Sequence, residues 1–122
     1  MYREDSLEHF KHPHKRGRLE DFDAETRKAN PNCGDVLDMT VKLSGDRKHI
    51  DDARFDGEGC AISVATTSMI MADIAKYTTE EWLHLSDDDF LKEMGLEDVT
   101  GARRNCALLS LHTLQDALSK RA

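Results

Sequence analysis

The chain has 122 residues, of which 39% are hydrophobic, and it carries a formal net charge of -7. This length fits a single domain over residues 1–122, and the negative charge argues against nucleic acid or an anionic membrane surface as the main partner. No apolar run is long enough to cross a bilayer and the N-terminus lacks the apolar centre of a secretory signal, so we expect a soluble, cytoplasmic protein.

The first part of the chain, residues 1–30, is expected to form a short helix and a loop. Residues 2–11 can form the helix, which Pro13 ends, and we expect it to dock loosely. Residues 17–32 are polar and show neither helical nor strand periodicity, which indicates a connecting loop with at most a short edge strand. Three histidines near the proline are interpreted as surface side chains, because nothing fixes the geometry that a metal needs. They are His9, His12 and His14.

Residues 36–43 alternate between apolar and polar side chains, which predicts a strand with one solvent-facing side. Its apolar members are Leu37, Met39, Val41 and Leu43. If the extended conformation begins at Cys33, then Cys33 and Asp35 point to the same side as the apolar set. A thiolate and a carboxylate placed in this way can be a pair of metal ligands, one soft and one hard. The alternative is that Asp35 belongs to an ordinary Asx-type turn before the strand.

Residues 44–46 have the residue types of a hairpin turn, Ser-Gly-Asp. Residues 49–55 can therefore return as an antiparallel strand beside the first one. Their alternation slips once, which predicts a β-bulge in this second strand.

Residues 61–76 are apolar nearly all round, which predicts a helix that is buried against the sheet. In the stretch before it, residues 55–63, we expect Gly57 and Gly59 to let the backbone turn sharply and to place Cys60 at the start of this helix. The exposed amides of a helix start favour a negatively charged atom, so a Cys60 thiolate is well placed to be a ligand. The alternative is a small buried residue at a tight turn.

Two short helices and one long helix are expected in the last third of the chain. Thr78 and Ser86 are the expected caps of the short helices, and the acidic run 87–89 is interpreted as a solvated helix start. The long helix is expected to begin at residue 100 or 101 and to end at about residue 120, because apolar residues recur there at helical spacing. These residues are Ala107, Leu108, Leu111, Leu114 and Leu118.

Cys106 lies in the second turn of the long helix, one turn after Arg103. Cations this close to a helix start oppose the helix dipole, so an anion should offset them. A Cys106 thiolate, a persulfide on it or a metal-sulfide cluster would do so, and a positive neighbour favours the thiolate. The alternative is a pair of ordinary surface arginines beside a half-buried Cys106.

The three cysteines of the chain cannot pair completely, and a reducing compartment favours metal or sulfur chemistry over disulfides. None of them forms a Cys-x-x-Cys pair, which argues against a knuckle-type zinc site. Cys33, Cys60 and Cys106 would instead be brought together by folding, with Asp35 beside them. Three sulfurs and one oxygen suit an iron-sulfur species or zinc, and the residues alone leave both metals open.

Four sets of residues stand out along the chain: NPNCGD at 30–35, FDGEGCAIS at 55–63, CALL at 106–109, and the N-terminal Tyr2, His9, Phe10 and Pro13. Together they resemble the IscU/NifU-type family of iron-sulfur cluster scaffolds, and the resemblance covers nearly the whole chain. It implies an α+β fold of the SufE/IscU type. In such a fold a three-stranded antiparallel sheet packs against several helices, and the C-terminal helix is long.

The resemblance also implies a role and a set of ligands. A pyridoxal-phosphate cysteine desulfurase deposits sulfur on such a scaffold, iron joins it, and a labile two-iron two-sulfur cluster passes to acceptor proteins. By matching positions, the ligands would be Cys33, Asp35, Cys60 and Cys106, and Cys106 would be the first persulfide acceptor. A hard carboxylate is a weak partner for iron in a sulfur-rich shell, so Asp35 would make one corner of the cluster labile. Whether two chains share one cluster as a homodimer stays open.

Two features depart from the pattern of bacterial IscU. Asn105 precedes Cys106 where IscU usually has a histidine, so we do not expect residue 105 to be a ligand, and Asp35 gains weight as the fourth one. Residues 96–104 lack the Leu-Pro-Pro-Val-Lys motif, so we do not expect hand-off by the dedicated Hsp70 chaperone.

Other functions stay open beside the scaffold. Arg103-x-x-Cys106 is similar to SufU, although the short interval from Cys60 to Cys106 is as in IscU, so the alternative is a zinc-dependent sulfurtransferase of the SufU type. A cysteine hydrolase would need a base in contact with its thiol, and His112 falls on a different side of the helix from Cys106. A structural zinc module would unfold when its metal is chelated, whereas a scaffold should stay largely folded.

Overall fold

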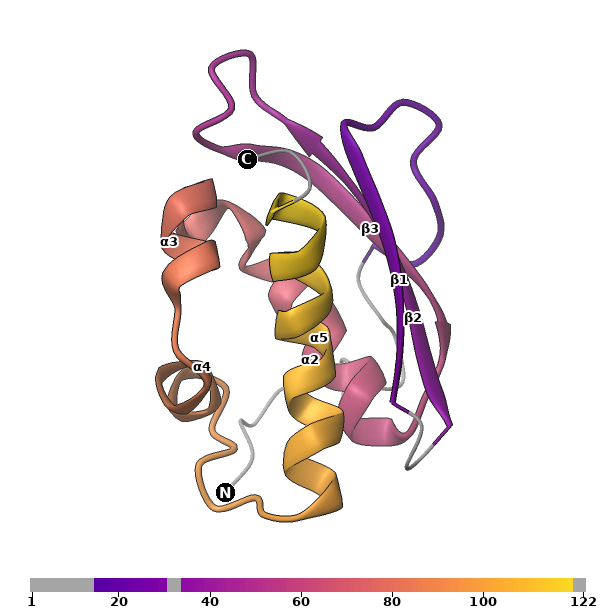
Figure 1. The fold of residues 1–122 in the computed structure, drawn as a ribbon, viewed down its shortest axis with the longest axis vertical. Coiled ribbons are helices and arrows are strands. Elements are labelled where there is room, and N and C mark those ends of the chain that lie inside the picture. Colours follow the sequence, from indigo (N-terminus) through magenta and orange to yellow (C-terminus); the bar gives the residue numbers. More distant parts are fainter. Residues whose placement is uncertain (1–14, 31–33, 120–122) are drawn as a thin grey trace.

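The structure, a computed structural model, describes residues 15–30 and 34–119 (Figure 1). Its three strands form one antiparallel sheet in the order β1-β2-β3, and the helices lie on one face of that sheet. The strands are β1 (Ala24–Asn30), β2 (Asp35–Leu43) and β3 (Ile50–Glu58). The helices are α2 (Ala61–Ala72), the 3-10 turn η1 (Ile74–Lys76), α3 (Thr79–His84), α4 (Asp87–Glu93) and α5 (Ala102–Ser119). The expected α+β fold, with its three-stranded antiparallel sheet and long C-terminal helix, is confirmed.

β1 is longer than the short edge strand that was expected in this polar segment. It pairs with β2 along its whole length, from Ala24 opposite Val41 to Asn30 opposite Asp35. The inward positions are filled by small or polar residues such as Ala24 and Thr26, which are both buried. The Thr26 hydroxyl donates a hydrogen bond to the Asp116 carboxylate of α5. The strand therefore lacks the large apolar residues by which alternation is recognised.

β2 confirms the expected alternation, because its four apolar residues are all buried. They are Leu37, Met39, Val41 and Leu43. The expected solvent-facing side is wrong at Thr40, which is buried at 2% exposure. The chain before β1 covers this position, and the Leu19 amide donates a hydrogen bond of 3.1 Å to Thr40 Oγ1.

The hairpin and the β-bulge are confirmed, since the register of β2 and β3 shifts between Lys42 and Leu43. However, β3 continues to Glu58, so the expected sharp turn at Gly57 is wrong. Gly57 is a strand residue that pairs with Leu37 at a φ of +126°. A Cβ atom at this position would lie 2.0 Å from the carbonyl oxygen of Val36, so only glycine allows the two strands to approach so closely here.

The expected helices form with small changes in their bounds. The buried helix ends at Ala72 rather than at residue 76, because Asp73 is its C-cap and a 3-10 turn follows. Thr78 and Ser86 cap α3 and α4 through hydrogen bonds of their side chains, as expected. At the other end of α3, the Gln115 side chain of α5 donates hydrogen bonds to the carbonyl oxygens of Trp82 and Leu85 at 2.9 and 3.0 Å. Among the described residues, every helix is too short or too polar to cross a lipid bilayer.

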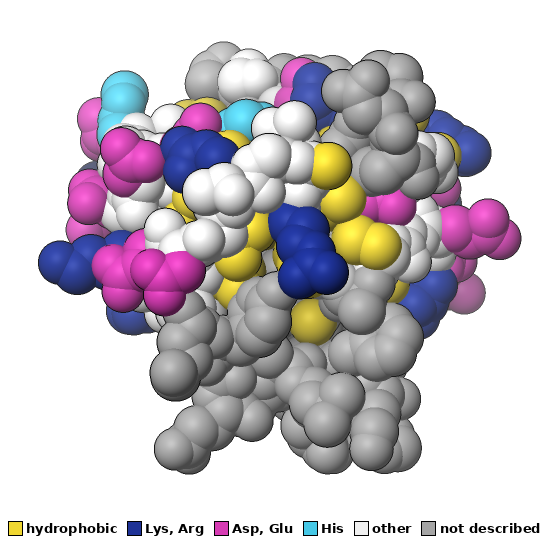
Figure 2. Space-filling model, turned by 90° about the horizontal axis from the view of Figure 1, so that it is seen from below, with side chains coloured by type: hydrophobic (Ala, Val, Ile, Leu, Met, Phe, Trp, Pro, Cys, Tyr) yellow, Lys and Arg dark blue, Asp and Glu magenta, His cyan; other side chains and the backbone are white. Residues whose placement is uncertain are grey.

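One end of the molecule collects the ends of several elements. The start of β2, the end of β3 and the starts of α2 and α5 all lie at the lower end in Figure 1. Seen from this end, hydrophobic side chains gather around a Lys or Arg side chain, and most of the acidic side chains lie toward the margins (Figure 2). The segments that carry Asp35, Cys60 and Cys106 therefore meet at one end of the fold.

We predict that Gly57→Ala will destabilise the protein by about 2–5 kcal/mol, because it adds both an unfavourable φ and a clash with Val36. Urea unfolding followed by circular dichroism measures this loss. Gly45→Ala is the matched control, since a Cβ atom there would meet nothing within 4 Å. Equal unfolding midpoints for the two variants would contradict the packing argument.

Candidate metal centre

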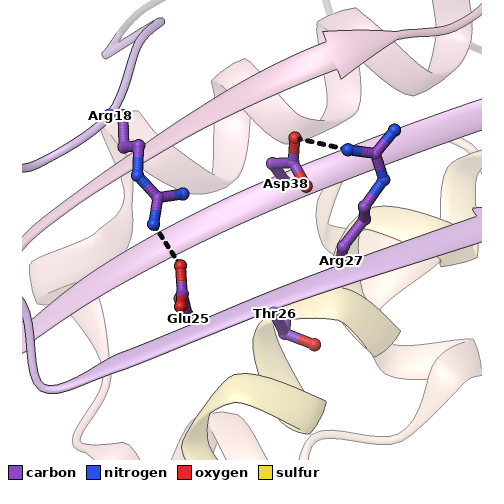
Figure 3. Close-up of a pocket in the computed structure, with 5 residues that line it drawn as sticks. All are labelled: Arg18, Glu25, Thr26, Arg27 and Asp38. Atoms are coloured by element: carbon purple, nitrogen blue, oxygen red, sulfur yellow. Dashed lines mark hydrogen bonds and ion pairs between the residues drawn. The ribbon is translucent and has the colours of Figure 1, made fainter.

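A hollow on the outer face of the sheet is one place that could hold a ligand (Figure 3). It has a volume of about 350 Å³ and is lined mainly by charged side chains. Arg18 forms an ion pair with Glu25, and Arg27 lies 3.5 Å from Asp38. The fifth lining residue, Thr26, points away from these groups toward α5 (Figure 3). The charged side chains that line the hollow are thus paired with one another, and none of the lining residues is a cysteine or a histidine.

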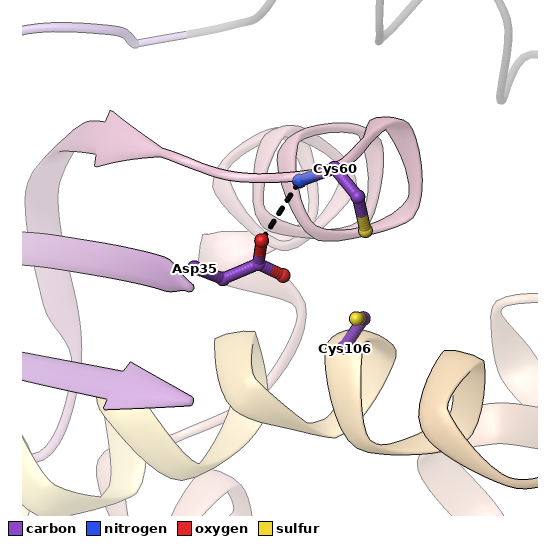
Figure 4. Close-up of side chains that lie close together, drawn as sticks. All are labelled: Asp35, Cys60 and Cys106. Carbon is purple, nitrogen blue, oxygen red and sulfur yellow. Dashed lines mark hydrogen bonds between the residues drawn. The ribbon is translucent and has the colours of Figure 1, made fainter. Parts of the chain in front are cut away.

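The second place is a cluster of three metal-binding side chains at the lower end of the fold. One ligand atom each from Asp35, Cys60 and Cys106 lies within 4.8 Å of the other two (Figure 4). The three residues come from the start of β2, the N-cap of α2 and the second turn of α5. Folding therefore brings together two thiols and a carboxylate that lie far apart in the sequence.

Asp35 is the first residue of β2, and only 3% of it is exposed. Its Oδ1 atom accepts a hydrogen bond of 3.0 Å from the backbone amide of Cys60, and its Oδ2 atom accepts one from the Ser63 hydroxyl. Gly59 makes this approach possible, since a Cβ atom there would lie 3.0 Å from Ser63 Cβ and 3.3 Å from Asp35 Cγ. The carboxylate is therefore fixed against the start of α2, and it is part of a strand rather than of an Asx-type turn.

Cys60 is the exposed member of the cluster. It precedes α2 with an extended backbone, as expected for a residue at a helix start. The Cys60 Sγ atom lies 3.7 Å from the hydroxyl of Ser63, which is one turn further along the helix. The Cys60 side chain makes no capping hydrogen bond, and no acidic side chain occurs in the first turn of α2, so the positive end of the helix dipole is not offset by a carboxylate of the helix itself.

Cys106 is buried, at 4% exposure, and not half-buried. Its carbonyl oxygen accepts a hydrogen bond of 3.3 Å from the Ser63 hydroxyl, which ties α5 to α2 beside the two thiols. Of the arginines before it, Arg104 lies 3.1 Å from the Asp88 carboxylate of α4, so a protein carboxylate already offsets that charge. Arg103 and Asn105 are exposed.

The three donors fit one four-coordinate metal. Metal-sulfur bonds of about 2.3 Å and metal-oxygen bonds of about 2.1 Å place the donors of a tetrahedral site roughly 3.5–3.8 Å apart. The observed separations of at most 4.8 Å need only a small closure of the side chains. A tetrahedral ion would require a fourth ligand, and Cys33, the fourth residue of the expected set, lies outside the described residues. The same is true of His9, His12 and His14.

The histidine required by a cysteine hydrolase is engaged elsewhere. The Nε2 atom of His112 lies 2.9 Å from the Asp87 carboxylate at the start of α4. The acidic run forms the first turn of α4 behind the Ser86 cap, as expected for a helix start. Its Asp88 carboxylate pairs with Arg104 of α5. His112 is therefore not placed as a base for the thiols of this cluster.

Ser63 is the residue of this centre to which the sequence assigned no role. Its side chain is fully buried and contacts all three members of the cluster. The spacing of three residues from Cys60 could have shown that the two share one face of the helix. Its contact with Asp35, however, depends on how β2 lies against α2, which helical spacing does not indicate.

Comparison with known sequences gives a consistent assignment. Residues 1–121 match the family described as NifU-like N terminal domain. The chain is 34% identical over 136 aligned positions to the zinc-dependent sulfurtransferase SufU of Bacillus subtilis (strain 168), covering 98% of this chain and 90% of that protein. It is 32% identical over 131 positions to the iron-sulfur cluster assembly scaffold protein IscU of Streptococcus pyogenes serotype M1, covering 94% and 80%.

Solved structures agree with the fold. The crystal structure of FiSufU from Fervidobacterium islandicum AW-1 is similar with a TM-score of 0.79 and 25% identity, covering 96% of each chain. The N-terminal NifU-like protein of Brucella abortus has a TM-score of 0.81 at 18% identity, covering 98% of this chain and 95% of that one. At that identity the second likeness concerns the fold alone.

Proposed function

Because the chain belongs to the family of NifU-like N-terminal domains, we propose that it is a scaffold on which an iron-sulfur cluster is assembled and then passed to acceptor proteins. The observation that carries this proposal is the meeting of Asp35, Cys60 and Cys106 within 4.8 Å at one end of the fold. Thiolates bind iron strongly, and the carboxylate adds a weaker, hard ligand. With Cys33 as the fourth ligand, the set suits a labile two-iron two-sulfur cluster.

The proposed source of sulfur is a pyridoxal-phosphate cysteine desulfurase. In this step the Cys106 thiolate attacks the outer sulfur of the desulfurase persulfide, so that Cys106 gains a persulfide and the desulfurase cysteine leaves as a thiolate. Free thiols of this kind need a reducing compartment, which supports a cytoplasmic location.

A zinc-dependent sulfurtransferase is the second candidate. Two observations favour it, namely the 34% identity to the Bacillus subtilis SufU and a donor set that fits one tetrahedral ion. In this function zinc would stay bound and sulfur alone would be accepted and passed on. The two candidates use the same residues and differ in what occupies the centre.

Anaerobic reconstitution with a cysteine desulfurase, cysteine and ferrous iron tests the proposal. A scaffold is expected to turn brown and to contain iron and sulfide in equal amounts, as measured by absorption and by metal and sulfide analysis. A colourless protein that retains one tightly bound zinc per chain would favour the sulfurtransferase. Chelation of the metal followed by circular dichroism separates both from a structural zinc module, which would unfold.

We predict that Asp35→Ala will hold the reconstituted cluster longer and transfer it more slowly to an apo-ferredoxin. The physical reason is that the carboxylate is the weakest ligand for iron in a sulfur-rich shell, so it opens first. The transfer rate is followed by the absorption of the acceptor. Equal or faster transfer from the variant would remove this role for Asp35.

We also predict that Cys106→Ser will abolish sulfur acceptance from the desulfurase, because a hydroxyl cannot form the persulfide. Mass spectrometry after a single turnover detects the added sulfur. Cys60→Ser is the matched control and should still accept sulfur at Cys106. Since Cys106 is buried and Cys60 exposed, the reverse pattern would assign sulfur acceptance to the accessible thiol instead.

A further inference from the structure

Ser63 contacts all three residues of the centre without being a strong metal ligand itself. Its hydroxyl donates a hydrogen bond to Asp35 Oδ2, and it lies 3.7 Å from Cys60 Sγ and 3.3 Å from the carbonyl oxygen of Cys106. We propose that Ser63 is a positioning residue that competes with the bound metal for the Asp35 carboxylate and so speeds release. This inference rests on the proposed function, because it requires Asp35 to be a ligand.

The hydroxyl of Ser63 has one proton and two oxygen acceptors within reach. A serine hydroxyl donates a single hydrogen bond at a time, so it serves either Asp35 or the carbonyl of Cys106. Without metal, the charged carboxylate is the stronger acceptor and takes the proton. When a metal binds the carboxylate, the hydroxyl can turn to the Cys106 carbonyl at 3.3 Å. Ser63 therefore has a partner in both states.

Because Ser63 and Asp35 are both buried, water cannot easily take the place of the Ser63 hydroxyl in this exchange. Ser63 is fully buried, and only 3% of Asp35 is exposed. A buried carboxylate that loses a hydrogen-bond donor is less stable in the metal-free state. In Ser63→Ala the carboxylate gains more from holding the metal, and the metal should leave more slowly.

The expected effect is a decrease of about three- to tenfold in the rate at which Zn²⁺ is released to excess chelator, and a similar decrease in cluster transfer. Ser110→Ala is the matched control. Ser110 is also fully buried, but its hydroxyl bonds the carbonyl of Ala107 within its own helix at 2.8 Å. The control removes the same atoms without affecting Asp35, so it should release metal at the wild-type rate.

A double-mutant cycle with Asp35→Ala separates positioning from packing. If Ser63 acts through the carboxylate, Ser63→Ala should change release by less than twofold in the Asp35→Ala background. An equal effect in both backgrounds, an effect of Ser110→Ala as large as that of Ser63→Ala, or faster release from Ser63→Ala would overturn the inference.

Measuring both Zn²⁺ release and iron-sulfur cluster assembly distinguishes a failure of the scaffold proposal from a failure of the role of Ser63. If the protein assembles no cluster but Zn²⁺ release shows the coupling of Ser63 to Asp35, the scaffold proposal fails and the role of Ser63 stands. If clusters form but Asp35→Ala changes neither Zn²⁺ release nor cluster transfer, the scaffold proposal stands and the role of Ser63 fails. A protein that binds neither Zn²⁺ nor a cluster contradicts both.

Discussion

The candidate centre depends on a carboxylate that is buried and held by hydrogen bonds from a neighbouring helix. Asp35 begins β2, and the start of α2 meets it with the Cys60 amide and the Ser63 hydroxyl. A buried carboxylate without such donors would be costly, so these bonds fix how β2 and α2 lie against each other. Because Cys60 provides both the amide and a thiol, the bond that satisfies Asp35 also places a sulfur beside it.

The candidate centre also requires that the backbone of residues 57–59 lies close to the start of β2, and two glycines allow this approach. Gly57 lets β3 lie against Val36 and Leu37, one and two residues after Asp35, and Gly59 leaves room for the carboxylate beside Ser63. The third donor comes from α5, whose Cys106 carbonyl is reached by the same hydroxyl. The three candidate ligand atoms therefore lie within 4.8 Å of one another, so that binding a metal would require only small movements of side chains.

The sequence predicted those parts of the fold whose pattern is set by large apolar side chains. The alternation of β2 and the helical spacing of α5 gave nearly correct bounds because their large buried apolar residues, leucine, methionine and valine in β2 and leucine in α5, follow the two patterns. β1 was underestimated because its inward positions carry residues such as Ala24 and Thr26, which the period-2 pattern does not reveal. The continuation of β3 through Gly57 could not be predicted either, since it depends on a backbone contact with the neighbouring strand.

At the centre, motifs indicated the thiols and the carboxylate, whereas burial and positioning became visible only in the fold. Cys60 is exposed and Cys106 is not, although both carry the same chemistry. For the proposed scaffold, this difference in exposure means that the two thiols of one site are not equally accessible to a partner protein. Under that proposal, sulfur transfer to the buried Cys106 would require that neighbouring groups first move aside, whereas the Cys60 thiol is already open to solvent. The Ser63 hydroxyl contacts the Cys60 thiol, the Asp35 carboxylate and the backbone carbonyl of Cys106, so a shift of the Cys106 backbone that uncovers its thiol would also disturb the hydrogen bond that holds Asp35. Loading and release would then be linked through one hydroxyl group.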